Sequence, residues 1–210
     1  MSPSPAGPGN GSGERAPPDL NADERRRLAA GEAGALERFY DLYFDRVYAY
    51  VRRLVREEHL AEDVTQDVFM HVYRSLESYD PERELRPWVY TIATNKVRDH
   101  WRSRRHREAQ QEVSAHGEDG EWEAAPPVSP GRGPAERVVA GELSEQVAEA
   151  IADMPEVMRT TLVLRYYEGL SFAEIGGMVD RNETAVRKRY SRALEELRNR
   201  LAHVAGKEEG

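Results

Sequence analysis

The 210-residue sequence contains no cysteine, which excludes disulfide frameworks and zinc sites built on thiolates. No apolar run approaches the roughly 20 residues that a membrane-spanning helix needs. No basic flank followed by an apolar stretch opens the chain, so nothing marks it for secretion. Strand-like alternation of apolar and polar residues is also missing. We therefore expect an all-α, cytoplasmic protein that is not inserted in a membrane.

The net charge of −8 arises outside the segments with helical periodicity. Residues 1–22 and 206–210 each carry −1, and residues 108–142 carry −6, from two arginines and eight carboxylates. The two other blocks, 23–107 and 143–205, are together neutral. The acidic balance therefore says little about what the folded parts bind.

Two segments rich in proline and glycine divide the chain. They contain few large apolar side chains, so they cannot bury enough surface to offset the entropy of ordering. We predict two small helical domains joined by a flexible acidic linker. The predicted parts are a disordered tail (1–22), a first domain (23–107), the linker (108–136), a second domain (137–205) and a short tail (206–210).

Apolar residues in the first block recur every three or four positions, as on one face of a helix. Such spacing predicts a long helix between Leu36 and Leu54 and a second one between Leu60 and Leu76. Pro81 stops helix continuation, and a third helix starts at about Arg86. The stripe of the first helix comprises Leu36, Phe39, Tyr40, Tyr43, Val47, Tyr50, Val51 and Leu54.

The second block carries several signals of helix ends. Pro155 suits a first helical turn, and Gly169 suits the position just past a helix end. Ser171 and Glu174 have the spacing of a capping box. Asn182 can cap the last helix. We therefore expect four short helices in this block.

Residues 171–201 have the outline of a helix-turn-helix, with a short supporting helix, a tight turn and a second helix that is polar on its outer face. Arginine can bind guanine edges with two hydrogen bonds, and lysine and further arginines bind phosphates. The alternative is a surface helix held by Arg–Glu pairs, which "RALEELRNRL" partly fits. The outward residues are Arg181, Glu183, Thr184, Arg187, Lys188 and Arg192.

Both blocks resemble one protein family. "MPEVMRTTLVLRYYEGLSFAEIGGMVDRNETAVRKRYSRALEELRNRL" is similar to the promoter −35-reading domain of extracytoplasmic-function (ECF) sigma factors, a subfamily of the bacterial sigma-70 family. "LERFYDLYFDRVYAYVRRLV", "AEDVTQDVFMHVYRSLESYDP" and "LRPWVYTIATNKVRDHWRSRRHR" resemble the family's core-binding and −10 domain. The resemblance covers roughly 25–107 and 138–203. It implies a factor that binds core RNA polymerase, recognises −35 and −10 promoter elements and promotes DNA melting.

Three residues depart from the family's pattern. Gly176 and Gly177 stand where the family usually has alanine and a polar residue, and each costs about 1 kcal/mol in a helix interior. Asp180 replaces a glycine in the turn, and aspartate is among the few other residues that tolerate a positive φ. "RNETAVRKRY" is also more charged than usual, so the family's promoter sequences cannot be carried over.

The resemblance assigns a patch on the second helix to the β′ clamp helices of RNA polymerase, and it implies a further contact with the β flap. Acidic and amide groups beside exposed apolar ones suit a basic helical partner. From the residues alone, a solvated helix face is the alternative. Phe69 is either an aromatic anchor or part of the core. The predicted polymerase-binding residues are Asp63, Gln66, Asp67, Phe69 and Met70.

In the family, the loop before the third helix captures a flipped −10 base, and the helix guides strand separation. Pocket contacts and stacking must offset the few kcal/mol that extrusion of a base costs. We expect Trp88 in the core, whereas Trp101 fits either the core or a stacking surface. The candidate base-reading residues are Tyr79, Asp80, Arg83, Arg86, Asn95 and Lys96, and the candidate phosphate ligands are Arg98, Arg102, Arg104, Arg105 and Arg107.

The linker and the partners carry further expectations. About 28 flexible residues have an r.m.s. span of roughly 30 Å, less than the ~50–70 Å between DNA domains one and a half to two turns apart. We predict that core polymerase holds the linker extended in a basic channel; a plain spacer is the alternative. The family also implies an anti-sigma factor that covers both domains.

Two other functions stay open on the sequence alone. A stand-alone helix-turn-helix regulator would explain 171–201, but it leaves "DVTQDVF" and the basic segment 96–107 without a role. A helical nuclease or nucleotide hydrolase would need a metal on Asp63 and Asp67, which share a helical face, yet no second carboxylate cluster is evident. We therefore expect no enzyme activity, no catalytic residue, no metal and no cofactor.

Overall fold

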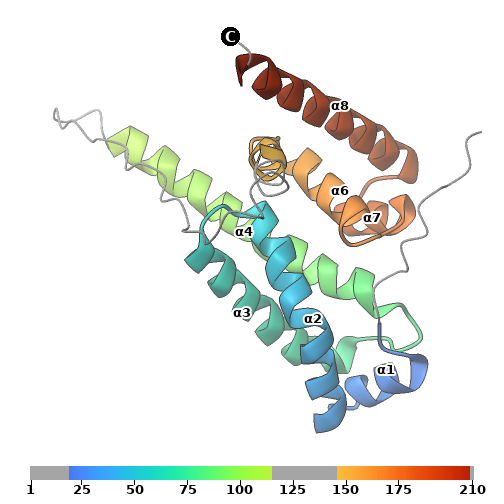
Figure 1. Cartoon of the computed structure of the whole chain (residues 1–210). Helices are drawn as coiled ribbons and strands as arrows, with labels where there is room; N and C mark the ends of the chain where they lie inside the picture. The colour runs from blue at the N-terminus through green and yellow to red at the C-terminus, as the bar shows by residue number, and fades with distance from the viewer. Residues whose placement is uncertain (1–18, 115–145, 209–210) are drawn as a thin grey trace, which may run out of the picture.

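A computed structural model describes residues 19–114 and 146–208 of the chain. Within these two ranges every regular element is a helix, which confirms the predicted all-α class. The first range contains α1 (Ala22–Ala29), α2 (Ala33–Leu54), α3 (Glu58–Ser75), the 3₁₀ helix η1 (Leu76–Ser78) and α4 (Leu85–Ser114). The second contains a helix over 146–152, then α6 (Glu156–Tyr166), α7 (Phe172–Val179) and α8 (Glu183–Glu208). Figure 1 shows α6, α7 and α8 on one side of α4, and α2 and α3 on the other.

The first bundle forms because α2, α3 and α4 each bury one apolar stripe. The predicted stripe of α2 is buried at Phe39, Tyr43 and Val47, among others. Tyr40 was expected in the same stripe, but 49% of it is exposed. Its ring lies beside the core face and stacks on Phe44 one turn later, with 4.8 Å between centroids. An i, i+3 spacing shows that a residue lies near the buried face of a helix. It does not show whether a side chain at the edge of that face is buried or exposed.

The described residues begin before the predicted domain start at residue 23. Leu20 is only 2% exposed, and Asn21 caps α1 in a reciprocal capping box with Glu24. At the other end, α4 continues through 108–114, which were predicted as linker. That stretch reads "EAQQEVS", and alanine, glutamine and glutamate are good helix formers. The rest of the predicted linker lies outside the described residues.

The second bundle confirms most of the predicted helix ends. Ser171 and Glu174 form the capping box of α7, and the Asn182 side chain accepts from the Ala185 amide at 2.8 Å. Gly169 follows α6 with a φ of 68°. Pro155 is the N-cap of α6 rather than a residue of its first turn.

The turn between α7 and α8 explains one of the two glycines that depart from the family pattern. A Cβ atom on Gly176 would lie 2.5 Å from the carbonyl oxygen of Arg181, so no side chain fits there. A Cβ on Gly177 would meet nothing within 4 Å. Asp180 ends α7 in the left-handed region, with a φ of 52°. Gly176 therefore allows the backbone of the turn to approach α7 closely. Asp180 adopts the left-handed conformation that reverses the chain direction after α7.

Candidate nucleic-acid and polymerase interfaces

All six predicted positions are exposed: Arg181 in the turn before α8, and Glu183, Thr184, Arg187, Lys188 and Arg192 on the outward face of α8. The inner face is held by buried Val186 and Ala193. Glu183 accepts a hydrogen bond from Arg187 at 2.6 Å, and the Arg187 guanidinium lies 4.6 Å from the centre of the Phe172 ring. These contacts hold the Arg187 side chain along the helix surface, between Glu183 and Phe172.

The loop between η1 and α4 divides its predicted residues into two groups. Tyr79 is buried, stacks on Trp88 at 4.7 Å between centroids, and donates from its hydroxyl to the Arg83 carbonyl at 2.7 Å. Burial raises the pKa of Tyr79 to about 12, so its hydroxyl stays protonated and can donate at neutral pH. Arg86 is also largely enclosed, whereas Asp80 and Arg83 are exposed. The packing of Trp88 against the core confirms the expectation for that residue.

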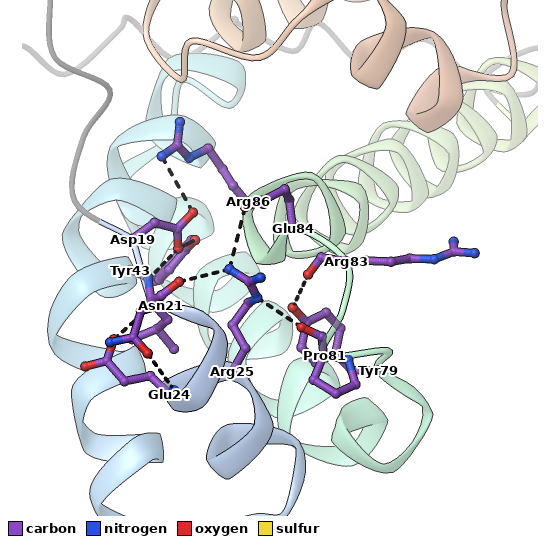
Figure 2. A network of polar contacts seen from close by, with 11 residues as sticks. Asp19, Asn21, Glu24, Arg25, Tyr43, Tyr79, Pro81, Arg83, Glu84 and Arg86 are labelled. Atoms are coloured by element: carbon purple, nitrogen blue, oxygen red, sulfur yellow. Dashed lines mark hydrogen bonds and ion pairs between the residues drawn. The ribbon is translucent and has the colours of Figure 1, made fainter.

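A polar network outside the predicted set surrounds this loop, and Figure 2 shows it from close by. Asp19 accepts from the Tyr43 hydroxyl at 2.5 Å and lies 3.6 Å from the Arg86 guanidinium. Arg25 on α1 donates to the Pro81 carbonyl at 3.0 Å. Both residues were missed because each lies far from the loop in sequence and carries no local motif.

The basic end of α4 presents several of the predicted phosphate ligands. Asn95 is exposed, and Lys96 and Arg98 are half-buried. Exposed Arg102, Arg104 and Arg105 form ion pairs with Asp99, Glu57 and Glu156 at 3.4 to 3.7 Å. Trp101 packs against the core, with the Arg159 guanidinium 5.8 Å from its ring centre. The side chain of Arg107 lies outside the described residues.

The predicted polymerase patch on α3 is exposed at Asp63, Gln66, Asp67 and Met70. Phe69 is half-buried, and its ring centre lies 5.3 to 5.6 Å from those of Tyr40, Phe44 and Phe39. Phe69 is therefore both a packed residue and the centre of an aromatic cluster at the surface, formed with Tyr40 and Phe44 on α2. The sequence signal for this cluster is the i, i+4 pair Tyr40 and Phe44 at the edge of the α2 stripe.

The two bundles contact each other through a buried carboxyl group. Glu168, just after α6, is only 4% exposed, accepts a hydrogen bond from the Tyr90 hydroxyl of α4, and lies 3.9 Å from Arg46 of α2. Burial raises the pKa of Glu168, against the opposing effects of Tyr90 and Arg46. Nearby, Arg53 lies over the Tyr167 ring at 4.0 Å. Sequence reasoning assigned no role to Glu168.

A cavity of about 250 Å³ lies between the bundles. Arg98 and Arg102 of α4 line it on one side, and Arg189 of α8 lines it on the other. Burial lowers the pKa of Arg189, and the charges of Arg181 and Arg98 lower it further. In this arrangement the basic segment of α4 and part of α8 therefore face the same space.

In 19–114 and 146–208, no three histidine, aspartate or glutamate side chains lie together as a metal site would require. Over the same ranges, none of the helices combines the length and the apolar character needed to cross a bilayer.

Comparison with protein families gives two matches in the order of the two bundles. Residues 39–107 match the model for Sigma-70 region 2, and residues 144–197 match the model for Sigma-70, region 4. The chain is 31% identical to the ECF RNA polymerase sigma factor SigW of Bacillus subtilis (strain 168), over 84% of this chain and 94% of that protein. It is also 31% identical to the ECF RNA polymerase sigma factor SigK of Mycobacterium ulcerans (strain Agy99), over 87% and 94%.

Solved structures show the same fold. CnrH in complex with the cytosolic domain of CnrY matches with a TM-score of 0.63 at 22% identity, over 87% of this chain and 99% of that one. The sigma factor RpoE of Bartonella quintana, in complex with the anti-sigma factor NepR, matches with a TM-score of 0.57 at 19% identity, over 79% and 96%.

Proposed function

The chain belongs to the ECF subfamily of the sigma-70 family of RNA polymerase sigma factors, and from this premise we propose which surfaces carry its tasks. As a sigma factor it binds core RNA polymerase, recognises −35 and −10 promoter elements and promotes DNA melting to initiate transcription. Members of the family are transcription initiation factors. We propose that this chain performs no covalent chemistry itself and acts in the cytoplasm, where polymerase and promoter DNA are.

The −35 element is assigned to α8. The observation that supports this most strongly is that Arg181, just before the helix, and Glu183, Thr184, Arg187, Lys188 and Arg192 on it are all exposed, whereas the opposite face of the helix is buried. Arg187, held by Glu183, is suited to a bidentate contact with a guanine edge, and Lys188 to a phosphate.

The −10 element is assigned to the loop 79–86 and to the exposed side of α4. Asp80, Arg83 and Asn95 are exposed to an unpaired base, although Asp80 and Arg83 pair with each other at 3.4 Å. Arg102, Arg104 and Arg105 can exchange their ion pairs for phosphates. Tyr79 and Arg86 act indirectly, because both are used to hold the loop. Lys96 and Arg98 lie half-buried on the same helix and complete the set.

The polymerase contact is assigned to the α3 patch and the aromatic cluster beside it. Exposed Asp63, Gln66 and Asp67 offer charge and amide groups, and Met70 with the rings of Tyr40 and Phe69 offers apolar area. Interfaces are enriched in aromatic residues and methionine at their centre and are polar at their rim. We assign this patch to the β′ clamp helices and a second contact, from the region 4 bundle, to the β flap.

An anti-sigma factor is the further partner that we propose. It is supported by the likeness of the fold to CnrH and RpoE, both solved in complexes, the second with an anti-sigma factor. The extended path of the acidic linker through core polymerase also stays a proposal, because its residues lie outside the described ranges.

In vitro transcription tests this assignment. Core polymerase with and without the protein is supplied with genomic fragments, and transcript starts are mapped. We expect new starts preceded by two shared elements. An absence of new starts, together with tight binding of the protein alone to duplex DNA, would contradict the function and favour a stand-alone regulator.

The polymerase surface is tested separately by titrating core polymerase with Asp67→Asn and Met70→Ala. We expect each change to weaken core binding about tenfold, because charge pairs and apolar anchors at an interface each contribute on this scale. Glu58→Gln alters an exposed carboxylate in the first turn of the same helix and should bind like wild type. Equal weakening by all three variants would remove the patch from the interface.

A further inference from the structure

Residues 19–26 precede the segment that matches Sigma-70 region 2, which begins at residue 39, yet they contact the loop assigned to the −10 element. Arg25 donates from Nε to the Pro81 carbonyl at 3.0 Å, and its Nη1 lies 3.8 Å from a carboxylate oxygen of Glu84. Asp19 lies 3.6 Å from Arg86. Figure 2 shows both side chains reaching from the N-terminal segment to the loop. The contacts therefore reach the loop near its start and at its end.

The same two residues are anchored to the body of the first bundle. Asp19 accepts from the Tyr43 hydroxyl at 2.5 Å and from the Leu20 amide at 2.8 Å. Arg25 donates to the Leu20 carbonyl at 3.1 Å, and Leu20 itself is buried. Because Tyr43 is fully buried in α2, the network connects the loop to the core rather than to another mobile segment.

The Asp19–Arg86 pair differs from an ordinary surface ion pair in its burial, whereas Arg25 is enclosed but its partner Glu84 is 67% exposed. The Arg25, Asp19 and Arg86 side chains are 13%, 19% and 13% exposed. Partly buried pairs are screened less by salt and lose less entropy on pairing, because packing already restricts their side chains. Between the fixed ends of the loop, Arg83 and Asp80 pair with each other at 3.4 Å, and their side chains are 82% and 54% exposed. The ends of the loop are therefore held by contacts with the first bundle, while the side chains in its middle remain accessible.

We propose that Asp19 and Arg25 are positioning residues that hold the loop 79–86 so that Asp80 and Arg83 face the non-template strand of the −10 element. This inference rests on the function proposed above for the loop. A loop that is already shaped does not have to be ordered when it captures a base, so more of the contact energy is available for base recognition. Asp19 and Arg25 touch no DNA in this account; they act through Arg86 and the Pro81 carbonyl.

Two substitutions separate this role from simple stability. Asp19→Asn retains a hydrogen-bond acceptor for Tyr43 but removes the charge that faces Arg86. Arg25→Gln shortens the side chain and removes its hydrogen bond to the Pro81 carbonyl. Matched controls are Glu32→Gln and Arg27→Gln, since these two residues pair with each other at 2.7 Å and make no contact with the loop. Asp23 is not used, because its partner Arg26 also pairs with Glu82 in the loop at 3.1 Å.

The assay uses the full chain with core polymerase and a single-stranded oligonucleotide with the non-template −10 sequence of a promoter mapped by transcription. A second oligonucleotide carries substituted −10 bases. We expect Asp19→Asn and Arg25→Gln to lower the affinity ratio between the two about tenfold. Core affinity should be unchanged, and both control variants should retain the wild-type ratio.

The ratio is the decisive quantity because a variant that merely loses folded protein weakens binding to both oligonucleotides equally. Such an equal loss, with a lower melting temperature, overturns the proposal, and so does an unchanged ratio. Arg83→Ala distinguishes this failure from a failure of the proposed function. If Arg83→Ala lowers discrimination and Asp19→Asn does not, only the positioning role is wrong. If neither changes it, the assignment of the loop to the −10 element is wrong as well.

Discussion

The loop 79–86 and the helix α8 are both assigned to promoter DNA, but they use their polar side chains differently. In the loop, Tyr79 and Arg86 bond to protein groups in the interior, and Asp80 and Arg83 lie at the surface, paired with each other. In α8, every outward residue is exposed, and apolar side chains and caps orient the helix. The major groove of a duplex has a defined shape into which an α-helix fits without further adaptation. An unpaired base has to be bound in a pocket that the protein forms. The element that we assign to single-stranded DNA is therefore the one with the larger internal polar network.

The largest expected effect lies in the turn that orients α8. Gly176→Ala places a Cβ 2.5 Å from the Arg181 carbonyl oxygen, so the turn must shift. We expect a loss of about 1–3 kcal/mol in the free energy of unfolding, as for overpacked sites, and a loss of binding to a duplex with the mapped −35 element. Thermal unfolding and duplex titration measure both. Gly177→Ala is the matched control and should be neutral or stabilising by up to about 1 kcal/mol. Equal behaviour of the two variants would show that α8 does not depend on the close approach.

The next effect tests whether the exposed face of α8 reads bases. Arg187→Ala should weaken binding to the mapped −35 duplex by about 1–3 kcal/mol and relax the preference at one position, because a bidentate base contact is lost. Lys188→Ala should weaken binding to all duplexes alike and reduce the slope of affinity against salt by about one. Titrations with native and substituted duplexes at several salt concentrations separate the two results. If Arg187→Ala weakened binding to native and substituted duplexes equally, Arg187 would contact phosphates and not bases.

A moderate, pH-dependent effect concerns the contact between the bundles. Burial raises the pKa of Glu168 when the bundles touch. Glu168 therefore binds its proton more tightly when the bundles are in contact than when they are separated. By linkage, the contact between the bundles is strongest below the ordinary pKa of glutamate. It weakens as pH rises through the raised value. Energy transfer between dyes on the two bundles, measured from about pH 4 to pH 8, should report this opening.

Glu168→Gln provides the check, because it keeps an acceptor for the Tyr90 hydroxyl and removes the titration. The pH dependence of energy transfer should disappear in this variant and persist in Glu195→Gln, which alters an exposed carboxyl group on α8. An unchanged pH profile in Glu168→Gln would assign the opening to another group.

The smallest expected effect lies within the loop. Tyr79→Phe keeps the ring against Trp88 and removes the hydrogen bond to the Arg83 carbonyl, so the free energy of unfolding should fall by about 1 kcal/mol. Thermal denaturation measures it. Tyr73→Phe, at an exposed position on α3, should change nothing. A Tyr79→Phe protein as stable as wild type would show that the internal network of the loop contributes less than the comparison with α8 suggests.

The sequence predicted α8 well because its signals are local. The capping box at Ser171 and the cap at Asn182 lie close to each other in sequence, and the structure confirms both. Of the apolar stripe expected on the helix, Val186 and Ala193 are buried, but Leu194 at its edge is 38% exposed. The exposed α3 residues Asp63, Gln66 and Asp67 follow from helical spacing in the same way. Local periodicity is sufficient where one face of a helix alone decides burial.

The loop was predicted less completely because its geometry depends on distant residues. Arg25 and Pro81 are 56 residues apart, and no pattern near either one indicates that they meet. Arg86 has the composition of a DNA ligand, and only the position of Asp19 shows that its charge is used inside the protein. Glu168 is a similar case, because its burial results from contact with the other bundle.

The close approach at Gly176 also limits how this protein can be redirected to new promoters. Every side chain on the outer face of α8 is exposed, so each can be exchanged to alter base preference with little risk to folding. The backbone carbonyl of Arg181 occupies the space next to Gly176, and that position must keep its hydrogen whatever sequence is chosen for the helix after it. A library for altered specificity can therefore vary six surface positions freely, provided that this one glycine is left untouched.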